Sequence, residues 1–427
     1  MRLRPRQSEP IFRAKFMRFH HAALVLFVAV TAHGQEWTRF RGPNGSGISE
    51  ARSIPASWSE KDFNWKLELP GAGHSSPVLW GEKVFVTSGD TKRSQFVVSC
   101  VQAGDGKPLW QKEFPLTALH KNNLNSFASA TPATDAARVY IHRTDAARTF
   151  LFALDHAGNQ VWERDLGPFR AQHGSGASPM VYADKVILAN EQDGESFLIA
   201  VAATTGKTLW QTPRQTARSS AAYSTPCVHQ PAGANPALIF NSEVHGISAI
   251  APDSGKVMWE FPGAFDMRSV SSPVILGDLI LGACGSGGGG NYVVAVRPGD
   301  ANGKPAERAY EVRKSAPYVP TSVCVGEWLY LWSDAGIVSR VHAATGAIKW
   351  QERVGGNFFG SPVWVDGRLF CVSRSGEVVV VNAGEKFEIL ARNPLNETTH
   401  STPAVAGGRM FIHTTGHLIC VGGKPTP

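Results

Sequence analysis

The chain has 427 residues, of which 43% are hydrophobic and 18% are charged, and this balance excludes wholesale disorder because a large core can form. The formal charge of +7 lies mostly in residues 1–34, where six basic residues and one acidic residue account for all but +2 of it. A nearly neutral body does not offer the basic surface that follows nucleic-acid phosphates, so we expect no nucleic-acid partner.

Residues 1–34 have the order of a secretory signal peptide. A basic stretch is followed by an apolar run at 22–30 and by small residues before an expected cleavage site after Gly34. The run is about half of the roughly 20 residues that a membrane helix needs, and no Cys stands at the cleavage site, so we expect neither a membrane span nor a lipid anchor. The sequence predicts an exported protein, periplasmic or extracellular, with translation starting at Met1 or Met17.

An extension rich in Gly and Pro follows the leader at 35–61 and contains Trp37 and Trp58. We expect it to pack over the outside or across one face of the domain that begins at residue 62.

A repeat then organises the chain. Two small residues and a Pro precede an apolar run at intervals of 40 to 55 residues, as expected for the blades of a β-propeller. The eight copies have their third residue at Pro77, Pro132, Pro179, Pro226, Pro273, Ser322, Pro362 and Pro403, with Ser322 in the place of Pro in a degenerate copy.

A second mark of the repeat is a Gly-containing turn that leads into a strand with a Trp. We interpret it as a hairpin whose Gly takes positive φ, followed by an outer strand whose indole wedges between neighbouring blades. Tyr310 and Ile389 stand near this position in two decayed copies. The tryptophans assigned to this structural role are Trp65, Trp110, Trp162, Trp210, Trp259 and Trp350.

The count of strands at the two ends predicts how the ring closes. Each unit contains four β-like runs, but the chain stops after the third run of the eighth unit, at 418–421. An additional run at about 62–68 precedes the first unit and would complete the last blade. The predicted fold is all-β: a single eight-bladed propeller of four-stranded antiparallel blades at 62–421, with a tail at 422–427.

These motifs resemble the pyrroloquinoline-quinone-type (PQQ-like) β-propeller repeat superfamily. The segment Ala-Ala-Thr-Thr-Gly-Lys-Thr-Leu-Trp at 202–210 has the form of its repeat signature, and the opening Trp-Thr-Arg-Phe-Arg-Gly-Pro at 37–43 is similar to exported bacterial members of largely unassigned function. A more distant similarity is to the propeller lipoprotein that assists outer-membrane β-barrel assembly. Because propellers host many unrelated activities, the resemblance implies a fold rather than one function.

The superfamily's name raises the alternative of a quinoprotein oxidoreductase. In such enzymes, the resemblance implies, the channel holds pyrroloquinoline quinone with calcium, a carboxylate base and, in one branch, adjacent cysteines. This chain has no adjacent Cys pair and no matching set of Glu, Asn and Asp ligands. We therefore expect no cofactor, with pyrroloquinoline quinone and calcium as the alternative.

The six cysteines are scattered over more than three hundred residues without any CxxC or His/Cys cluster. We interpret them as buried thiols, with one or two disulfide bridges as the alternative, and expect no zinc site.

Polar side chains recur in the connections that join one blade to the next, just before the Pro mark. In a propeller these loops surround the mouth of the central channel, where ligands usually bind. The alternative is that they only satisfy neighbouring blades. The predicted ligand-binding residues are His74, Asn125, His173, Arg218, Tyr223, Arg268, Asn357 and His400.

No catalytic residue or metal ligand is assigned. The histidines His74, His173 and His400 lack the spacing of a metal trio, and the run at 285–290 is interpreted as a flexible hairpin loop. The leading hypothesis is an exported, monomeric, non-enzymatic propeller that binds a protein, peptide or glycan partner at the channel mouth. The alternatives are the quinoprotein oxidoreductase and a glycan-active hydrolase or lyase.

Overall fold

The computed structural model describes residues 1, 37–118, 120–216 and 221–423. The signal peptide stays a prediction, because all of it except Met1 lies outside the described residues. None of the helices within the described ranges is long and apolar enough to cross a membrane.

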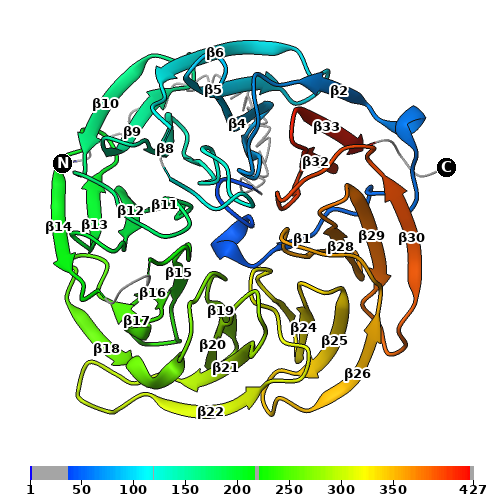
Figure 1. The fold of residues 1–427 in the computed structure, drawn as a ribbon. Coiled ribbons are helices and arrows are strands. Elements are labelled where there is room, and N and C mark those ends of the chain that lie inside the picture. The colour runs from blue at the N-terminus through cyan, green and yellow to red at the C-terminus, as the bar shows by residue number, and fades with distance from the viewer. Residues whose placement is uncertain (2–36, 119, 217–220, 424–427) are drawn as a thin grey trace. The chain divides into compact units, whose positions relative to one another are not determined.

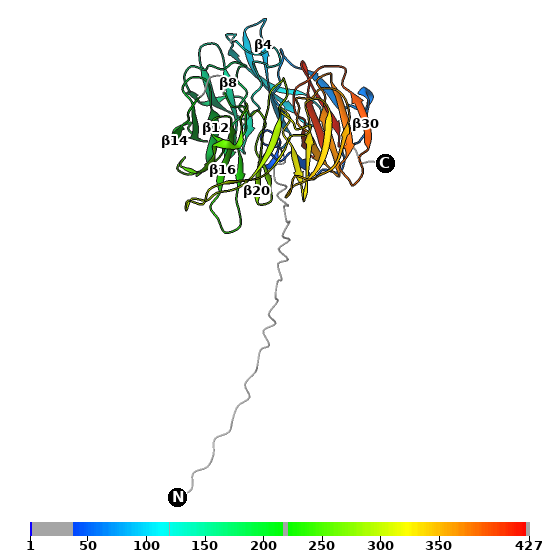
Figure 2. The ribbon, with the colours of Figure 1, turned by 60° about the horizontal axis from the view of Figure 1, so that its bottom comes forward.

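Eight sheets are arranged around a central axis (Figure 1), and Figure 2 shows strands of successive sheets standing side by side. Within each blade, strands A to D run from the channel to the circumference. The first four blades consist of β3 (Val78–Trp80), β4 (Lys83–Asp90), β5 (Gln95–Gln102) and β6 (Pro108–Pro115); β7 (Ala133–Thr134), β8 (Arg138–Thr144), β9 (Thr149–Asp155) and β10 (Gln160–Asp165); β11 (Met180–Tyr182), β12 (Lys185–Asn190), β13 (Phe197–Ala202) and β14 (Thr208–Pro213); and β15 (Cys227–His229), β16 (Ala237–Ser242), β17 (Gly246–Ile250) and β18 (Val257–Phe261).

Blades five to eight repeat this pattern. They consist of β19 (Val274–Leu276), β20 (Leu279–Cys284), β21 (Tyr292–Arg297) and β22 (Glu307–Val312); β23 (Val323–Val325), β24 (Trp328–Trp332), β25 (Ile337–His342) and β26 (Ile348–Arg353); β27 (Val363–Val365), β28 (Arg368–Val372), β29 (Glu377–Asn382) and β30 (Ile389–Pro394); and β31 (Ala404–Ala406), β32 (Arg409–His413), β33 (His417–Gly422) and β2 (Trp65–Glu68). Three short 3₁₀ turns are η1 (Pro43–Gly45), η2 (Glu60–Asp62) and η3 (Pro262–Ala264).

The predicted closure of the ring is confirmed. The amino-terminal strand β2 pairs antiparallel with β33, with Trp65 opposite Cys420 and Glu68 opposite His417, and so supplies the outer strand of the last blade. Because the two ends of the chain share one sheet, the last blade has its full set of strands (Figure 1).

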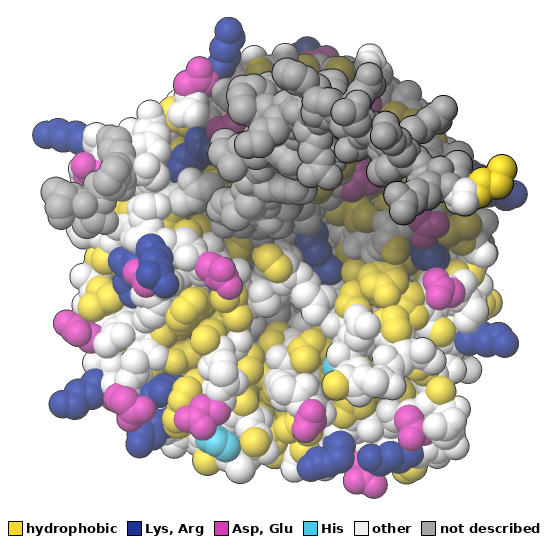
Figure 3. Space-filling model, turned by 180° about the vertical axis from the view of Figure 1, so that it is seen from behind, with side chains coloured by type: hydrophobic (Ala, Val, Ile, Leu, Met, Phe, Trp, Pro, Cys, Tyr) yellow, Lys and Arg dark blue, Asp and Glu magenta, His cyan; other side chains and the backbone are white. Residues whose placement is uncertain are grey.

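Burial follows from the position of each strand in the blade. The second and third strands are buried along almost their whole length, as in β4 and β5, because both faces of each sheet pack against neighbouring blades. The outer strands, such as β6, are largely exposed. On the face drawn in Figure 3, acidic and basic side chains of the described residues alternate around the rim.

The outer-strand tryptophans lie between blades, and five of them donate the indole N–H to a backbone carbonyl of the next blade. The bonds run from Trp65 to Ala103 (3.0 Å), Trp110 to His156 (3.0 Å), Trp162 to Ala203 (2.9 Å), Trp210 to Pro252 (2.8 Å) and Trp350 to Gly384 (3.3 Å). Tyr310 donates in the same way to Ala343 (2.6 Å), whereas Trp259 is buried next to Gly299.

The turn glycine of the following blade is covered by five of these rings, those of Trp65, Trp110, Trp162, Trp210 and Tyr310. A Cβ on Gly206, whose φ is +68°, would lie 2.6 Å from the indole of Trp162, and one on Gly106 would lie equally close to Trp65. The glycine of the repeat therefore serves two purposes, since it takes positive φ and lets the indole approach the backbone.

The amino-terminal extension differs from the expectation, because residues 37–49 lie inside the central channel (Figure 1, blue). The backbone N–H of Leu79 donates to Trp37 O (2.8 Å) and that of Thr134 to Thr38 O (2.8 Å). Strand β1 (Ile48–Ser49) pairs in parallel with β27, as a fifth strand of blade seven. We call residues 37–49 the plug. The physical reason for this placement is that the channel-facing edges of the inner strands need hydrogen-bond partners, which the plug provides.

The rest of the extension crosses blades seven and eight. The indole of Trp58 stacks on Phe370 at 6.3 Å between ring centroids, and its backbone N–H donates to Asn393 Oδ1 (2.8 Å). Ser53 Oγ donates to Gly408 O (2.8 Å).

Arg41 anchors the plug. Its guanidinium is fully buried and donates to the carbonyls of Thr321 (3.0 Å), Ser322 (2.7 Å) and Pro362 (3.1 Å), as well as to two carbonyls of the plug itself. Burial lowers its pKa to about 9, so the group still carries its charge at neutral pH. A buried cation surrounded by carbonyl oxygens connects the plug to blades six and seven.

The contact between turn glycine and indole predicts a large effect of a small substitution. We expect Gly206→Ala to lower the free energy of unfolding by about 3 kcal/mol, because an unfavourable φ and a clash with Trp162 add together. The matched control is Gly277→Ala, whose φ is +59° but whose added Cβ meets no atom within 4 Å, and it should cost about 1 kcal/mol. Urea unfolding followed by circular dichroism measures both; equal losses would show that the indole contact contributes nothing.

The buried hydrogen bonds of Arg41 give a second prediction. Arg41→Gln leaves buried carbonyls without donors, so we expect a loss of about 3 kcal/mol in the free energy of unfolding. The control Arg52→Gln removes an exposed arginine from the same extension and should change it by less than about 0.5 kcal/mol. Urea unfolding again gives the values, and an unchanged midpoint for Arg41→Gln would exclude an anchoring role.

Candidate functional site

A cavity of about 1060 Å³ occupies the channel mouth, and every blade contributes to its lining. It is as large as the upper range of known ligand pockets, about 1,000 Å³. We call it the funnel. Arg218 lies outside the described residues; the structure places the other seven predicted ligand-binding residues in the funnel lining, namely His74, Asn125, His173, Tyr223, Arg268, Asn357 and His400.

A belt of hydroxyl side chains surrounds the lower part of the funnel. In each blade a Ser or Thr stands directly before the Pro mark. Among the described residues, in seven of the eight blades, its hydroxyl accepts a hydrogen bond from the backbone N–H of the equivalent residue in the preceding blade. These bonds run from Ser76 to Thr131 (2.9 Å), Thr131 to Ser178 (2.9 Å), Thr225 to Ser272 (3.1 Å), Ser272 to Thr321 (3.0 Å), Thr321 to Ser361 (2.9 Å), Ser361 to Thr402 (2.9 Å) and Thr402 to Ser76 (3.3 Å).

The belt is part of the binding surface as well as of the frame, because all eight of its residues line the funnel. Phe40, from the plug, lines the same cavity. The plug therefore lies across the channel below the belt and gives the funnel a floor.

Two predicted residues from blades one and eight meet in one corner of the funnel. The imidazoles of His74 and His400 lie 4.3 Å apart between ring centroids, and Phe359 packs edge-on against His400 at 5.0 Å. Arg374 lies over the Phe359 ring at 4.7 Å, with its Nε 3.4 Å from His400 Nε2. We call these four residues the arginine corner.

The histidines of the arginine corner are uncharged at neutral pH. Burial, followed by the charges of His400, His413 and Lys121, lowers the pKa of His74 to about 3. Burial also lowers the pKa of His400. His400 Nδ1 lies 3.1 Å from Leu124 O, and because a carbonyl only accepts, Nδ1 carries the proton and Nε2 accepts from Arg374. The positive charge of this corner therefore belongs to Arg374.

The opposite wall carries the second arginine of the lining. Arg268 donates to Gln172 Oε1 (2.8 Å), and its charge opposes the burial that raises the pKa of Tyr223. The Tyr223 hydroxyl has no hydrogen-bond partner among the described residues. Burial also raises the pKa of Asp334, whose two oxygens accept the backbone N–H groups of Tyr318 (2.7 Å) and Val319 (3.1 Å).

The remaining predicted residues support the lining. Asn125 Nδ2 donates to the carbonyls of His173 (2.8 Å) and Ser175 (3.0 Å), so it joins blades two and three. The side chain of Asn357 is exposed, while its carbonyl accepts from Arg374 N (2.7 Å).

Further lining residues, which the sequence patterns did not indicate, come from the hairpins between the second and third strands. Asp334 and Arg374 both stand two residues before a positive-φ glycine, at Gly336 and Gly376, in equivalent turns. A polar residue at this spacing from the turn glycine was the signal that would have revealed them. The glycine-rich run at 285–290 is such a hairpin loop, between β20 and β21, and it also lines the funnel.

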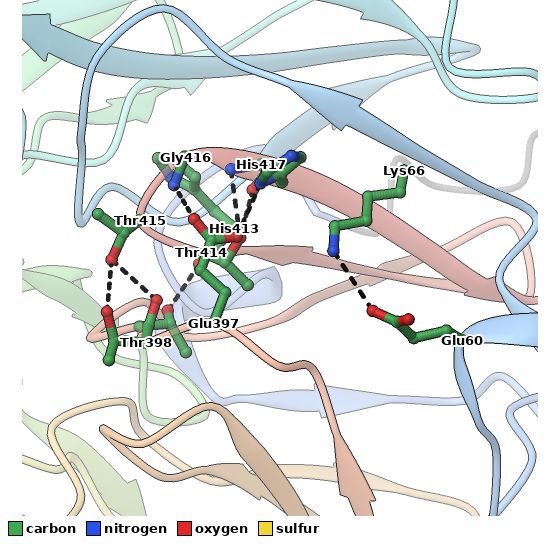
Figure 4. A network of polar contacts seen from close by, with 10 residues as sticks. Glu60, Lys66, Glu397, Thr398, His413, Thr414, Thr415, Gly416 and His417 are labelled. Carbon is green, nitrogen blue, oxygen red and sulfur yellow. Dashed lines mark hydrogen bonds and ion pairs between the residues drawn. The ribbon is translucent and has the colours of Figure 1, made fainter.

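A polar network beside the arginine corner fixes the connection into the last blade (Figure 4). The Glu397 carboxylate accepts from Thr414 Oγ1 (2.6 Å) and Gly416 N (2.7 Å) and lies 2.8 Å from His417 Nδ1. Burial acts to raise the pKa of Glu397, but the hydrogen bonds from Thr414 and His417 outweigh it and lower the value. The carboxylate thus holds the loop that carries His400.

The described residues contain no group of three or more His, Cys, Asp or Glu side chains that could hold a metal ion. Calcium takes about six to eight oxygen ligands, usually with several carboxylates. The described funnel lining has one carboxylate, Asp334, which is already hydrogen-bonded to backbone, so the donor set does not fit a calcium-bound quinone.

The expectation of buried thiols is confirmed, since all six cysteines are free and only Cys324 is partly exposed. Burial raises the pKa of the Cys100 and Cys227 thiols to about 12. These groups are therefore protonated at neutral pH and pack as small apolar side chains.

The chain matches the family model described as outer membrane protein assembly factor BamB over residues 57–233 and 334–421, together more than half of its length. No curated protein sequence matches it. Among solved structures it is similar to BamB from Moraxella catarrhalis, with 16% identity, a TM-score of 0.56, and 85% of this chain and 99% of that chain covered.

Dehydrogenases with the same fold are also similar in structure. A europium-containing methanol dehydrogenase has 11% identity and a TM-score of 0.66, with 90% of this chain and 98% of that chain covered. A quinohemoprotein alcohol dehydrogenase from Comamonas testosteroni has 15% identity and a TM-score of 0.61, with 92% and 81% covered. At such low sequence identities, the similarity to these structures shows a shared fold only.

Two buried histidines at equivalent positions predict how stability depends on pH. His142 Nδ1 donates to Ala177 O (2.8 Å) and His413 Nδ1 to Ser75 O (2.7 Å), each across a blade junction. Burial lowers both pKa values from 6.5 to about 4. Between these pH values the folded protein binds fewer protons than the unfolded chain, so this contribution to stability is complete above about pH 6.5 and is lost as the pH falls towards 4.

We expect the melting temperature to fall over this pH interval, and His142→Gln to make the fall shallower because one titrating group is removed. The exposed His120 provides the control, since His120→Gln should leave the slope unchanged. A pH series of thermal melts measures the slopes; identical slopes for wild type and His142→Gln would contradict the assignment.

Proposed function

Because the chain belongs to the family of the outer membrane protein assembly factor BamB, we propose that it is an exported, non-enzymatic binding module whose funnel accepts part of a protein, peptide or glycan partner. The observation that carries the proposal is the floor of the funnel. A cavity of about 1060 Å³ that ends on Phe40 is a receptacle and not a passage, and polar side chains from every blade point to a ligand with many hydrogen-bonding groups.

The frame around the funnel supports binding with little rearrangement. The hydroxyl belt connects the inner strands laterally, and the plug connects the same strands from inside the channel. Side chains on so rigid a support lose little conformational entropy when a ligand binds.

The enzymatic alternatives find less support in the lining. A glycoside hydrolase of the usual kind needs two carboxylates about 5 to 9.5 Å apart, whereas the described lining has one. A quinoprotein oxidoreductase remains the second candidate, favoured by the fold that the chain shares with methanol and alcohol dehydrogenases.

The test is a binding screen with a blocked funnel. We expect peptide or glycan arrays to give ligands of the mature chain, residues 35–427, that Asn357→Trp binds at least about 10-fold more weakly, because the indole fills space in the funnel without removing a side-chain hydrogen bond. The matched control, Asn302→Trp, places the same side chain on an exposed loop outside the funnel.

Two results would count against the proposal. Ligands that bind both variants and wild type equally would place the binding surface outside the funnel. A saturable rise in melting temperature with pyrroloquinoline quinone and calcium, abolished by a chelator, would favour the quinoprotein instead.

A further inference from the structure

We propose that the arginine corner is a carboxylate-binding subsite, and that the ligand of the funnel is an acidic glycan, that is, a short sugar polymer with uronate groups. This inference rests on the proposed function, because it assigns the chemistry of the ligand that the funnel accepts. It depends on three observations: an arginine without a carboxylate partner among the described residues, two neutral imidazoles beside it, and a lining rich in hydroxyl, amide and aromatic groups.

Arg374 differs from several buried or half-buried arginines of the propeller, which pair with carboxylates. Between blades six and seven Arg340 pairs with Glu385 at 3.2 Å, and between blades three and four Arg214 pairs with Glu260 at 2.7 Å. Within the described part of the chain no carboxylate lies within ion-pair distance of Arg374, and only its Nε has a side-chain hydrogen-bond partner, His400. Its two terminal amino groups are available for the bidentate bonding that a carboxylate prefers.

The surroundings of Arg374 hold it in place without neutralising it. The ring of Phe359 supports the guanidinium plane from one side, and His400 is itself fixed by Leu124 O at 3.1 Å. Because both imidazoles of the corner are neutral, they supply polar edges and do not add charge that would have to be solvated. A single fixed cation in a half-buried corner suits a single anionic group.

The remainder of the lining suits sugar hydroxyls. The belt brings eight Ser and Thr residues to the lower funnel, and the amide of Gln172 and the guanidinium of Arg268 lie on the wall opposite the corner. The Tyr223 hydroxyl, which has no partner among the described residues, would gain one from a ligand hydroxyl. The ring of Tyr318, which also lines the funnel, offers an apolar face for the C–H groups of a pyranose.

An extended peptide is a poorer fit, because in three of the blades the backbone groups that it would need are already used. Peptides added to a sheet are held mainly by main-chain hydrogen bonds to an open strand edge. In blades one, two and seven the plug occupies the channel-facing edge, through Leu79, Thr134 and Trp364. The funnel lining is also rich in polar side chains, which favours a polyhydroxylated ligand.

The experiment uses trimers of galacturonate, glucuronate, mannuronate and guluronate, each compared with its methyl ester, in calorimetric titrations of the mature chain. We expect at least one uronate trimer to bind and its ester to bind about 10- to 100-fold more weakly, because a charge-assisted hydrogen bond is lost while the shape is kept. This comparison changes the ligand and leaves the protein as it is, so it does not depend on the folding of a variant.

Variants of the protein complete the test. Arg374→Gln should weaken the uronate about 10- to 100-fold and leave the ester unchanged, and Arg374→Lys should recover part of the loss. The control Arg297→Gln removes an exposed arginine outside the funnel and should have no effect.

The outcomes separate the inference from the proposed function. Equal binding of acid and ester, with no effect of Arg374→Gln, would overturn the subsite while leaving the funnel a binding site. If none of the trimers bound but an arrayed peptide did so in a manner that Asn357→Trp blocks, the glycan class would be wrong and the binding module would stand. Binding that Asn357→Trp does not affect would overturn both.

Discussion

The edges of the inner strands that face the channel are the constraint on which the rest of this structure depends. Eight sheets around an axis expose eight such edges, whose backbone groups need partners. Two devices supply them. The Ser or Thr before each Pro mark links one blade to the next, and the Pro itself favours an extended backbone at that residue, so the hydroxyl faces its neighbour. Deeper in the channel, carbonyls of the plug accept from Leu79 and Thr134. In blade six, where Ser322 replaces Pro, Arg41 donates to the carbonyls of both Thr321 and Ser322, so the plug supports the blade whose Pro mark is missing.

Periodic features of this fold were predictable from the sequence, and aperiodic ones were not. The number of blades and the closing strand around Trp65 followed from counting, because each copy of the repeat occupies the same place in its blade. His74 and His400 could be assigned to the channel mouth for the same reason, since both stand at a fixed distance from a Pro mark. The plug occurs once, and whether Trp37 lies inside or outside the ring depends on the width of the channel, which no local pattern contains. Arg374 shares its spacing from a turn glycine with Asp334, but the hairpins between second and third strands differ in length in several other blades, so the repeat did not mark its position.

The two kinds of channel arginine illustrate opposite uses of one side chain. Arg41 is fully buried and has its hydrogen bonds satisfied by carbonyl oxygens, so it keeps its charge only because five donors find five acceptors. Arg374 is half-buried and retains unused donors that face the funnel. A guanidinium of the first kind stabilises a fold, and one of the second kind can stabilise a ligand. The two arginines differ in their hydrogen-bond partners. The sequence alone does not distinguish them, because both appear there as isolated basic residues.

The floor and the arginine corner are physically connected. Arg41 donates to Pro362 O, and the belt residue Ser361 precedes that proline directly. Phe359, on which the Arg374 guanidinium rests, lies only two residues further back along the same connection. The plug therefore fixes the start of the inner strand of blade seven, and that strand fixes the support of the cation. A ligand carboxylate would meet a guanidinium whose position is set from below by the plug and from the side by His400, and would not have to order either group on binding. In this structure the segment that closes the channel is also the segment that prepares the site above it.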